Sequence, residues 1–114
     1  MKKIAITVNN ENDNIYWQFG HCPRFKVFEV NDENHIVSYG YLPAGDDQGG
    51  QKLEAMVQND VNVIISEGMG QGVVDKIEEE GLSIEVYAGV KGKADDAIIK
   101  YLAGVLEAEH LTVH

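Results

Sequence analysis

The stretch VNVIISEGMGQG, residues 61–72, decides the fold. Its first half, residues 61–66, is a short apolar run rich in β-branched residues, which is typical of a buried strand. Three glycines then turn the chain, and Val73, Val74 and Ile77 follow at the spacing of one helix face. A strand that leads directly into a helix indicates a right-handed crossover to a parallel strand. The stretch therefore predicts an α/β protein.

The same periodicity extends to both ends of the chain. Strands are predicted at residues 4–8, 24–30, 35–42, 61–66 and 83–88, and helices around Leu53, at 73–80 and at 94–105. The order β-β-β-α-β-α-β-α predicts a ribonuclease H-like motif with a mixed five-stranded sheet in the order 3-2-1-4-5, strand 2 antiparallel, and three helices. Residues 1–106 are expected to form this single domain, and residues 107–114, with His110 and His114, a solvated tail.

The chain is strongly acidic. Its 114 residues carry a formal net charge of -10, and the pI is near 4.6. Since nucleic acids and anionic lipids are bound through lysine and arginine, neither partner is expected. The single cysteine requires no oxidising compartment, and no apolar run approaches the length of a signal peptide or a membrane span. A cytoplasmic protein without a membrane partner is expected.

In a sheet of this kind, ligands collect outside the carboxyl ends of the parallel strands. Three loops are expected to meet there, at residues 9–23, 43–50 and 67–72. In the last loop Gly68, Gly70 and Gly72 precede a helix, so backbone N–H groups and the positive end of the helix dipole can face an anion. The alternative is that these glycines only permit a tight turn. Their spacing matches neither the dinucleotide fingerprint nor the P-loop.

Cys22 and His21 are the candidate metal ligands of the first loop. A thiolate and an imidazole suit several of the same metals, but one cysteine cannot hold an ordinary iron–sulfur cluster, which takes about four protein ligands. Neighbouring residues of an extended chain also point to opposite sides, so a buried structural cysteine is the alternative. A preassembled cluster with its own inorganic ligands needs only one or two protein attachments. Phe19 is expected to anchor this loop in the core, and Gly20 to set its bend.

The sequence does not assemble an enzymatic site. Two-metal phosphoryl hydrolysis needs clustered carboxylates on the central strands, and residues 4–8 and 61–66 contain none. Ser66 has neither a partner histidine nor the G-x-S-x-G context of a serine hydrolase, and it is expected to support the glycine turn. The chain is therefore expected not to be an enzyme.

Four segments of the chain resemble one protein family. They are residues 1–8 (MKKIAITV), 19–25 (FGHCPRF), 63–70 (VIISEGMG) and 89–104. They are similar to the dinitrogenase iron–molybdenum cofactor biosynthesis family, which includes NifX-type proteins and the C-terminal domain of NifB-type proteins. The resemblance covers nearly the whole chain. Its most specific part is the Phe-Gly-x-Cys-x-x-Phe element followed later by the Gly-x-Gly turn.

This resemblance implies a ribonuclease H-like fold and the binding of iron–sulfur precursors, without catalysis of their synthesis. Some members carry histidines in the loop that corresponds to residues 43–50, which here contains none. We expect a carrier or scaffold for an iron–sulfur or iron–molybdenum-type cluster or its precursor, with Cys22 as leading ligand, His21 second, and a metallocluster donor or acceptor protein as partner. The alternative is a metal-free module that binds a small anionic metabolite or a protein partner.

Overall fold

The computed structural model describes residues 1–44 and 49–111. Its strands are β1 (Lys2–Val8), β2 (Arg24–Val30), β3 (Ile36–Pro43), β4 (Val63–Ile65), β5 (Glu85–Ala88) and β6 (Glu109–His110). Its helices are α1 (Gly49–Gln58), α2 (Gln71–Glu79) and α3 (Ala94–Leu102), with one turn of 3-10 helix, η1, at Phe19–His21. Residues 45–48 of the predicted 43–50 loop, and His114, lie outside the described residues.

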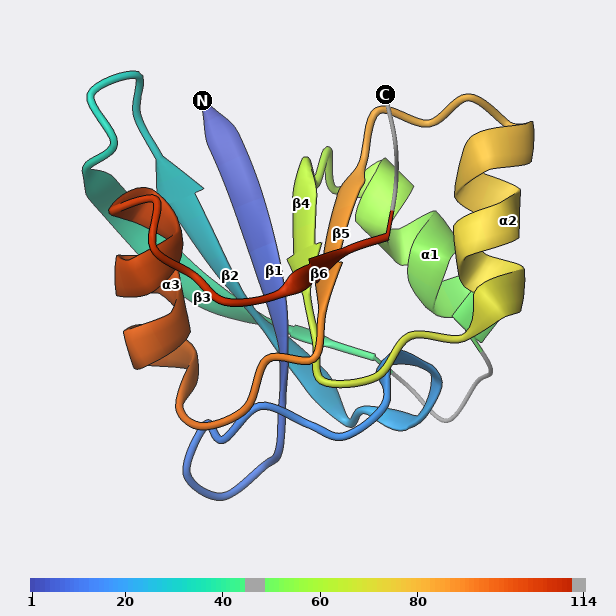
Figure 1. Ribbon diagram of the computed structural model, residues 1–114, viewed down its shortest axis with the longest axis horizontal. Coiled ribbons are helices and arrows are strands. Elements are labelled where there is room, and N and C mark those ends of the chain that lie inside the picture. Colours follow the sequence, from blue (N-terminus) through green and yellow to red (C-terminus); the bar gives the residue numbers. More distant parts are fainter. Residues whose placement is uncertain (45–48, 112–114) are drawn as a thin grey trace.

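The sheet is mixed and has the strand order β3-β2-β1-β4-β5-β6 (Figure 1). β1 pairs antiparallel with β2 along its whole length and parallel with β4 on its other side. β3 extends the antiparallel side, and β5 extends the parallel side. The predicted order of the first five strands, the antiparallel direction of strand 2 and the three helices are thus confirmed.

The sheet has a sixth strand where the sequence predicted only five. β6 pairs antiparallel with β5, with His110 opposite Tyr87. The two rings stack with centroids 4.6 Å apart, and the backbone N–H of Leu111 donates to the carbonyl oxygen of Val86 at 2.9 Å. The segment predicted as a solvated tail therefore adds an edge strand, held by backbone pairing and one ring contact.

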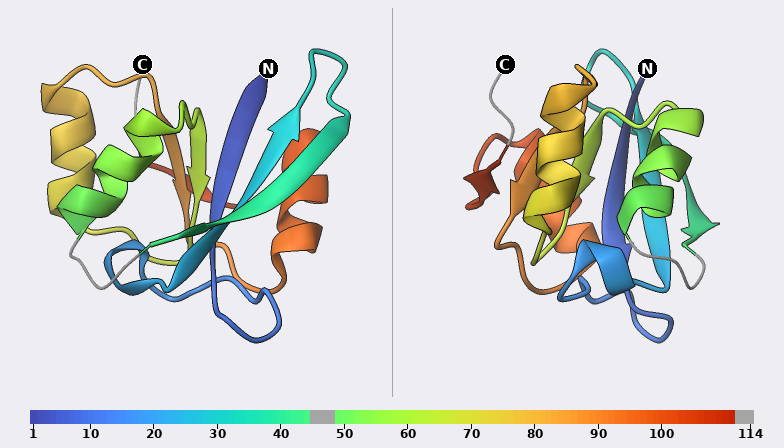
Figure 2. Two further views of the ribbon diagram at one scale, coloured as in Figure 1. Left: turned by 180° about the vertical axis from the view of Figure 1, so that it is seen from behind. Right: turned by 90° about the vertical axis from the view of Figure 1, so that its right-hand side faces the viewer.

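Helices cover both faces of the sheet (Figure 2). Ile4, Ile6 and Val8 of β1 pack with α3 on one face, whereas Ala5 packs with α1 and α2 on the other. Because successive strand residues point to opposite faces, a strand covered on both sides must be apolar throughout. This explains why residues 4–8 of β1, apart from Thr7, and residues 63–65 of β4 are all apolar.

α3 is shorter than the helix predicted over residues 94–105. It ends at Leu102, and Gly104 adopts a positive φ of 75°. The N–H of Val105 donates to the carbonyl oxygen of Lys100 at 2.9 Å, which satisfies one of the last helical carbonyl groups. Val105, predicted on the buried stripe, is 64% exposed as a result.

The loops that follow β1, β4 and β5 gather at one end of the sheet, the lower end in Figure 1. Parallel strands have their carboxyl ends on the same side, so this gathering follows from the topology. Within residues 1–44 and 49–111, none of the helices has the length and apolar character needed to cross a membrane.

Candidate functional site

Two of the loops predicted to form a shared site are hydrogen bonded to each other. The backbone N–H of Phe19 donates to the carbonyl oxygen of Gly68 at 3.0 Å. The Ser66 hydroxyl donates to the same oxygen at 2.8 Å and accepts a hydrogen bond from Thr7 Oγ1 at 3.1 Å. Figures 1 and 2 accordingly place η1 beside the segment that leads from β4 to α2. The structure thus brings the Phe19–Gly20–His21 turn and the glycine turn together.

The third predicted loop contacts the first one at Ala44. The N–H of Ala44 donates to the carbonyl oxygen of Pro23 at 3.2 Å. Its residues 45–48 lie outside the described part of the chain. The described site therefore consists of residues from two loops.

Gly68 is a glycine because of close packing. A Cβ at this position would lie 2.5 Å from the carbonyl oxygen of Trp17, closer than real Cβ contacts allow. Its carbonyl group is also the acceptor that fixes Phe19. For Gly68 the structure therefore supports the alternative in which glycine serves the turn itself.

Gly70 and Gly72 differ from Gly68 in this respect. A Cβ at either position would have no heavy atom within 4 Å, and Gly70 has ordinary extended dihedrals, φ -68° and ψ 139°. Gly70 is the N-cap of α2, and Gly72 lies exposed in its first turn. Among the described residues there is thus no steric need for glycine here, and the two residues leave space at a helix N-terminus, where unsatisfied N–H groups and the dipole favour an anion.

Cys22 points into the core. Its side chain is fully buried in the cluster beneath α1 and α2, together with Phe19 and Phe25, whose ring centroids lie 5.4 Å apart. Burial raises the pKa of the Cys22 thiol to about 12, although the charge of Lys52 acts in the opposite direction. At neutral pH the group is therefore a thiol, in the position of the predicted structural alternative.

His21 points the other way and is exposed. Its ring stacks on Trp17, with centroids 5.3 Å apart and an interplanar angle of 21°. Trp17 is itself 56% exposed, which is unusual for the largest side chain. Its backbone carbonyl oxygen lies against Gly68 of the glycine turn. Trp17 was not among the predicted site residues, although an aromatic residue inside a polar loop could have indicated a binding role. The two predicted ligands, His21 and Cys22, are not brought together.

The sequence matches the profile of a known family, described as dinitrogenase iron-molybdenum cofactor, over residues 1–104. The chain belongs to this family. The match covers every described strand except β6, and it confirms the resemblance inferred from the four sequence segments. A search of curated proteins finds no match to this family member.

Solved structures share the fold of this dinitrogenase iron–molybdenum cofactor family member at low identity. The crystal structure of PH0822 has a TM-score of 0.81 at 18% identity, covering 94% of this chain and 96% of the other. The apo form of the orange protein from Desulfovibrio gigas has a TM-score of 0.78 at 18% identity, covering 96% and 93%. A candidate NifB protein from Thermotoga has a TM-score of 0.74 at 16% identity, covering 100% and 97%.

The described residues of this family member do not assemble a site for a single metal ion. Among the residues that the structure describes, no three His, Cys, Asp or Glu side chains come together as a metal-binding group. A single ion bound by protein alone takes about four ligands, which this site does not offer within that part of the chain.

Proposed function

We propose that this protein is a non-catalytic carrier or scaffold for an anionic iron–sulfur or iron–molybdenum-type cluster, or for a precursor of one. The cluster is cargo and binds at the N-terminus of α2, beside Trp17 and His21. One observation carries the proposal: Gly70 and Gly72 lie at a helix N-terminus, and a Cβ at either position would meet no heavy atom of the described residues within 4 Å. Membership of the dinitrogenase iron–molybdenum cofactor family supports the choice of cargo.

The chemistry of the opening favours an anion with polarisable surface atoms. N–H groups at the start of α2 can donate to the sulfides of a cluster, and hydrogen bonds to sulfur tune and stabilise such groups. The net charge of -10 repels large anions from most of the protein surface. A local N–H cradle binds an anion without requiring a basic patch.

In this proposal His21 takes precedence over Cys22 as candidate ligand, because the two side chains differ in exposure. His21 is exposed and can reach an iron atom from solvent, whereas Cys22 is fully buried and protonated at neutral pH. Ligation by Cys22 would require η1 to leave the core together with Phe19, which is also fully buried. We therefore assign the first attachment to His21 and keep Cys22 as a ligand only of a rearranged loop.

A carrier role also agrees with the way Ser66 is used. Its hydroxyl hydrogen is committed to the Gly68 carbonyl oxygen, and its oxygen accepts from Thr7. A nucleophilic serine needs a base as its hydrogen-bond acceptor instead. Ser66 therefore acts as a brace for the turn. The proposed partner is a protein that donates or accepts the cluster, and the proposed location is the cytoplasm, where reducing conditions keep the Cys22 thiol free.

Anaerobic reconstitution with iron and sulfide tests this proposal. The wild-type protein is expected to acquire sulfide-to-iron charge-transfer absorption together with stoichiometric iron and sulfide after desalting. His21→Ala should lower the absorbance, and Cys22→Ala should leave most of it. Protein that elutes without iron and sulfide under these conditions contradicts the proposal.

The burial of Cys22 favours a second candidate, a metal-free module for a small anionic metabolite at the same opening. In that case inorganic phosphate or molybdate should raise the thermal midpoint of the metal-free protein. The raised midpoint should disappear when Gly72 is replaced by leucine. Anion stabilisation without any uptake of iron and sulfide would select this candidate over the carrier.

A further inference from the structure

β3 is an edge strand with little protection. It runs over eight residues, Ile36–Pro43, at the end of the described sheet, and its sequence IVSYGYLP contains no charged residue. Ile36 and Val37 are 41% and 48% exposed, and Tyr39 and Tyr41 are 63% and 44% exposed. Natural edge strands are usually short or carry charges, prolines or bulges that prevent pairing with another chain. In β3 the proline comes only at the last position, and an irregularity in the pairing with β2 lies near its first residues, at Val37.

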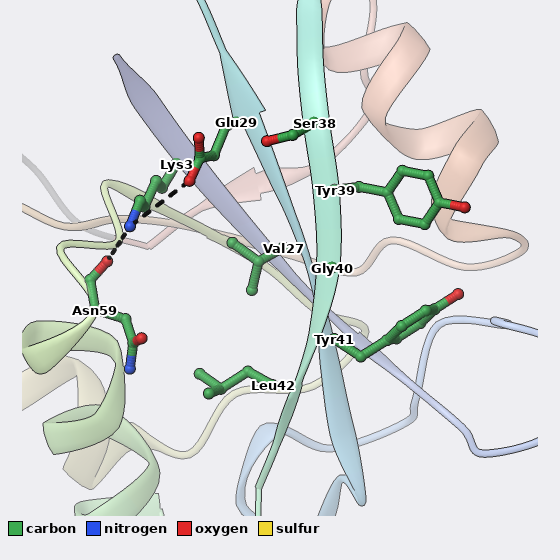
Figure 3. A pocket seen from close by; sticks show the side chains of 9 residues that line it. All are labelled: Lys3, Val27, Glu29, Ser38, Tyr39, Gly40, Tyr41, Leu42 and Asn59. Carbon is green, nitrogen blue, oxygen red and sulfur yellow. Dashed lines mark hydrogen bonds and ion pairs between the residues drawn. The ribbon is translucent and has the colours of Figure 1, made fainter.

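A hollow lies on one face of this strand at Gly40. It has a volume of about 270 Å³ and is floored by Val27 and Leu42 (Figure 3). Figure 3 shows that Tyr39 and Tyr41 point to the opposite side of β3. A Cβ at Gly40 would have no heavy atom of the described residues within 4 Å, so packing among those residues does not require glycine here. Glycine inside a strand commonly marks a place where another backbone or ligand approaches.

We propose that β3 pairs antiparallel with β3 of a second copy of this chain, about a two-fold axis through Gly40. In this register the two Gly40 residues face each other, Ser38 lies opposite Leu42 of the second copy, and Tyr39 lies opposite its Tyr41. Two cross-strand tyrosine pairs then form on the α3 face, a favourable combination. On the other face, Leu42 of the second copy lies opposite Ser38 and beside the hollow of the first copy.

The charge distribution favours a second copy of this chain as the partner that pairs with β3. An isologous interface places each surface patch against itself, which in a chain of net charge -10 brings acids together on most surfaces. β3 itself is uncharged, and several of the charged side chains beside it are held in ion pairs. On the hollow side Lys3 lies 3.8 Å from Glu29. On the tyrosine side Arg24 and Lys26 are paired with Asp13 and Asp95.

The same geometry limits the assembly to two copies. An antiparallel ladder about a two-fold axis uses both β3 edges and leaves β6 as the outer edge of each copy. β6 is only two residues long and includes Glu109. A short, charged strand is a poor template for further pairing, so the expected assembly is a closed dimer with a continuous sheet. This inference does not depend on the proposed function.

The mass of the protein in solution tests the inference. Sedimentation equilibrium from about 10 μM to about 1 mM, which covers weak to moderate affinities, should show a monomer–dimer equilibrium. Gly40→Lys places two ammonium groups face to face at the axis and should weaken dimerisation at least about tenfold. The open space at Gly40 allows this side chain in the monomer, so circular dichroism and the thermal midpoint should remain those of a folded protein.

Val105→Lys is the matched control. Val105 is 64% exposed and lies beyond α3, so this variant adds the same charge at an exposed apolar position outside β3. It should dimerise as the wild type does. A protein that stays monomeric throughout the range, including one that binds an added β-strand peptide instead, overturns the inference. So does a dimer that Gly40→Lys leaves intact.

Discussion

The backbone N–H of Phe19 donates to the carbonyl oxygen of Gly68 at 3.0 Å, and this bond joins the two loops that form the candidate site. Phe19 is fully buried, so the bond ties the glycine turn to the core through one ring. It holds Gly68, two residues before the N-cap of α2, against η1 and against the backbone of Trp17. The three glycines of this turn consequently have different roles, which substitutions can separate.

Replacing Gly68 by alanine should destabilise the protein by about 1–3 kcal/mol, since the new Cβ overlaps the Trp17 carbonyl oxygen and the loops must move apart. Gly70→Ala, two residues away, should change the free energy of unfolding by less than about 1 kcal/mol, because its Cβ enters open space. Urea unfolding of both variants measures the difference. Equal losses at the two positions would show that the turn is not packed as described.

Alkaline pH should destabilise the folded state through Cys22. Its pKa is raised by burial from 9.0 to about 12, so above pH 9 the unfolded chain loses a proton that the folded chain keeps. Stability from this group is therefore complete below pH 9 and lost as the pH rises toward 12, with a slope of up to about 1.4 kcal/mol per pH unit. Urea unfolding between pH 8 and 10.5 should show a steeper decline for the wild type than for Cys22→Ala. Identical slopes would place Cys22 in contact with solvent.

Acid should act through Asp13. This carboxylate accepts a hydrogen bond from the Tyr41 hydroxyl, the main cause of its lowered pKa, and pairs with Lys26 at 3.1 Å. Asp13→Asn should cost about 1–3 kcal/mol at neutral pH, where the buried Lys26 loses a partner. A group with a lowered pKa contributes its stability above the ordinary value of 3.8 and loses it as the pH falls further.

The difference in unfolding free energy between the wild type and Asp13→Asn should therefore shrink as the pH falls below 3.8. Unfolding free energies at pH 7, 4 and 2.5 measure it. A gap that stays constant with pH would assign the loss to packing and not to the charge of Asp13.

The strand order could be predicted because it depends on local patterns. β4 is a continuous apolar run, β1 is apolar from Ile4 to Val8 apart from Thr7, and the polar turn between β2 and β3 fixes a hairpin. β6 could not be predicted in this way, because a two-residue strand has no periodicity of its own and exists only through its pairing with β5. The end of α3 could not be predicted either. The helix stops at Leu102, three residues before the apolar stripe ends at Val105, and Gly104 turns the chain with a positive φ.

The candidate site was predictable as a place but not as a set of contacts. Topology alone brings the loops after β1 and β4 to the same edge. The sequence cannot tell that Gly68 is packed while Gly70 and Gly72 face open space, since that difference depends on where the Trp17 carbonyl oxygen lies. Nor does adjacency in sequence reveal that Cys22 enters the core and His21 stacks on Trp17.

The central claim is that the space at Gly72 serves a ligand, and Gly72→Leu tests it most directly. Leucine forms helix better than glycine, so this variant should be more stable than the wild type by about 0.5–1 kcal/mol. Its side chain would fill the space at the N-terminus of α2. Gln58→Leu, an exposed neutral position at the end of α1, adds the same side chain away from the site and is the control.

The decisive measurement is iron and sulfide retained after anaerobic reconstitution and desalting, compared among the wild type, Gly72→Leu and Gln58→Leu. The proposal predicts that Gly72→Leu is folded and more stable, yet binds the cluster at least about tenfold more weakly, whereas Gln58→Leu binds as the wild type does. A stable Gly72→Leu protein that retains the full amount of iron and sulfide would contradict the claim.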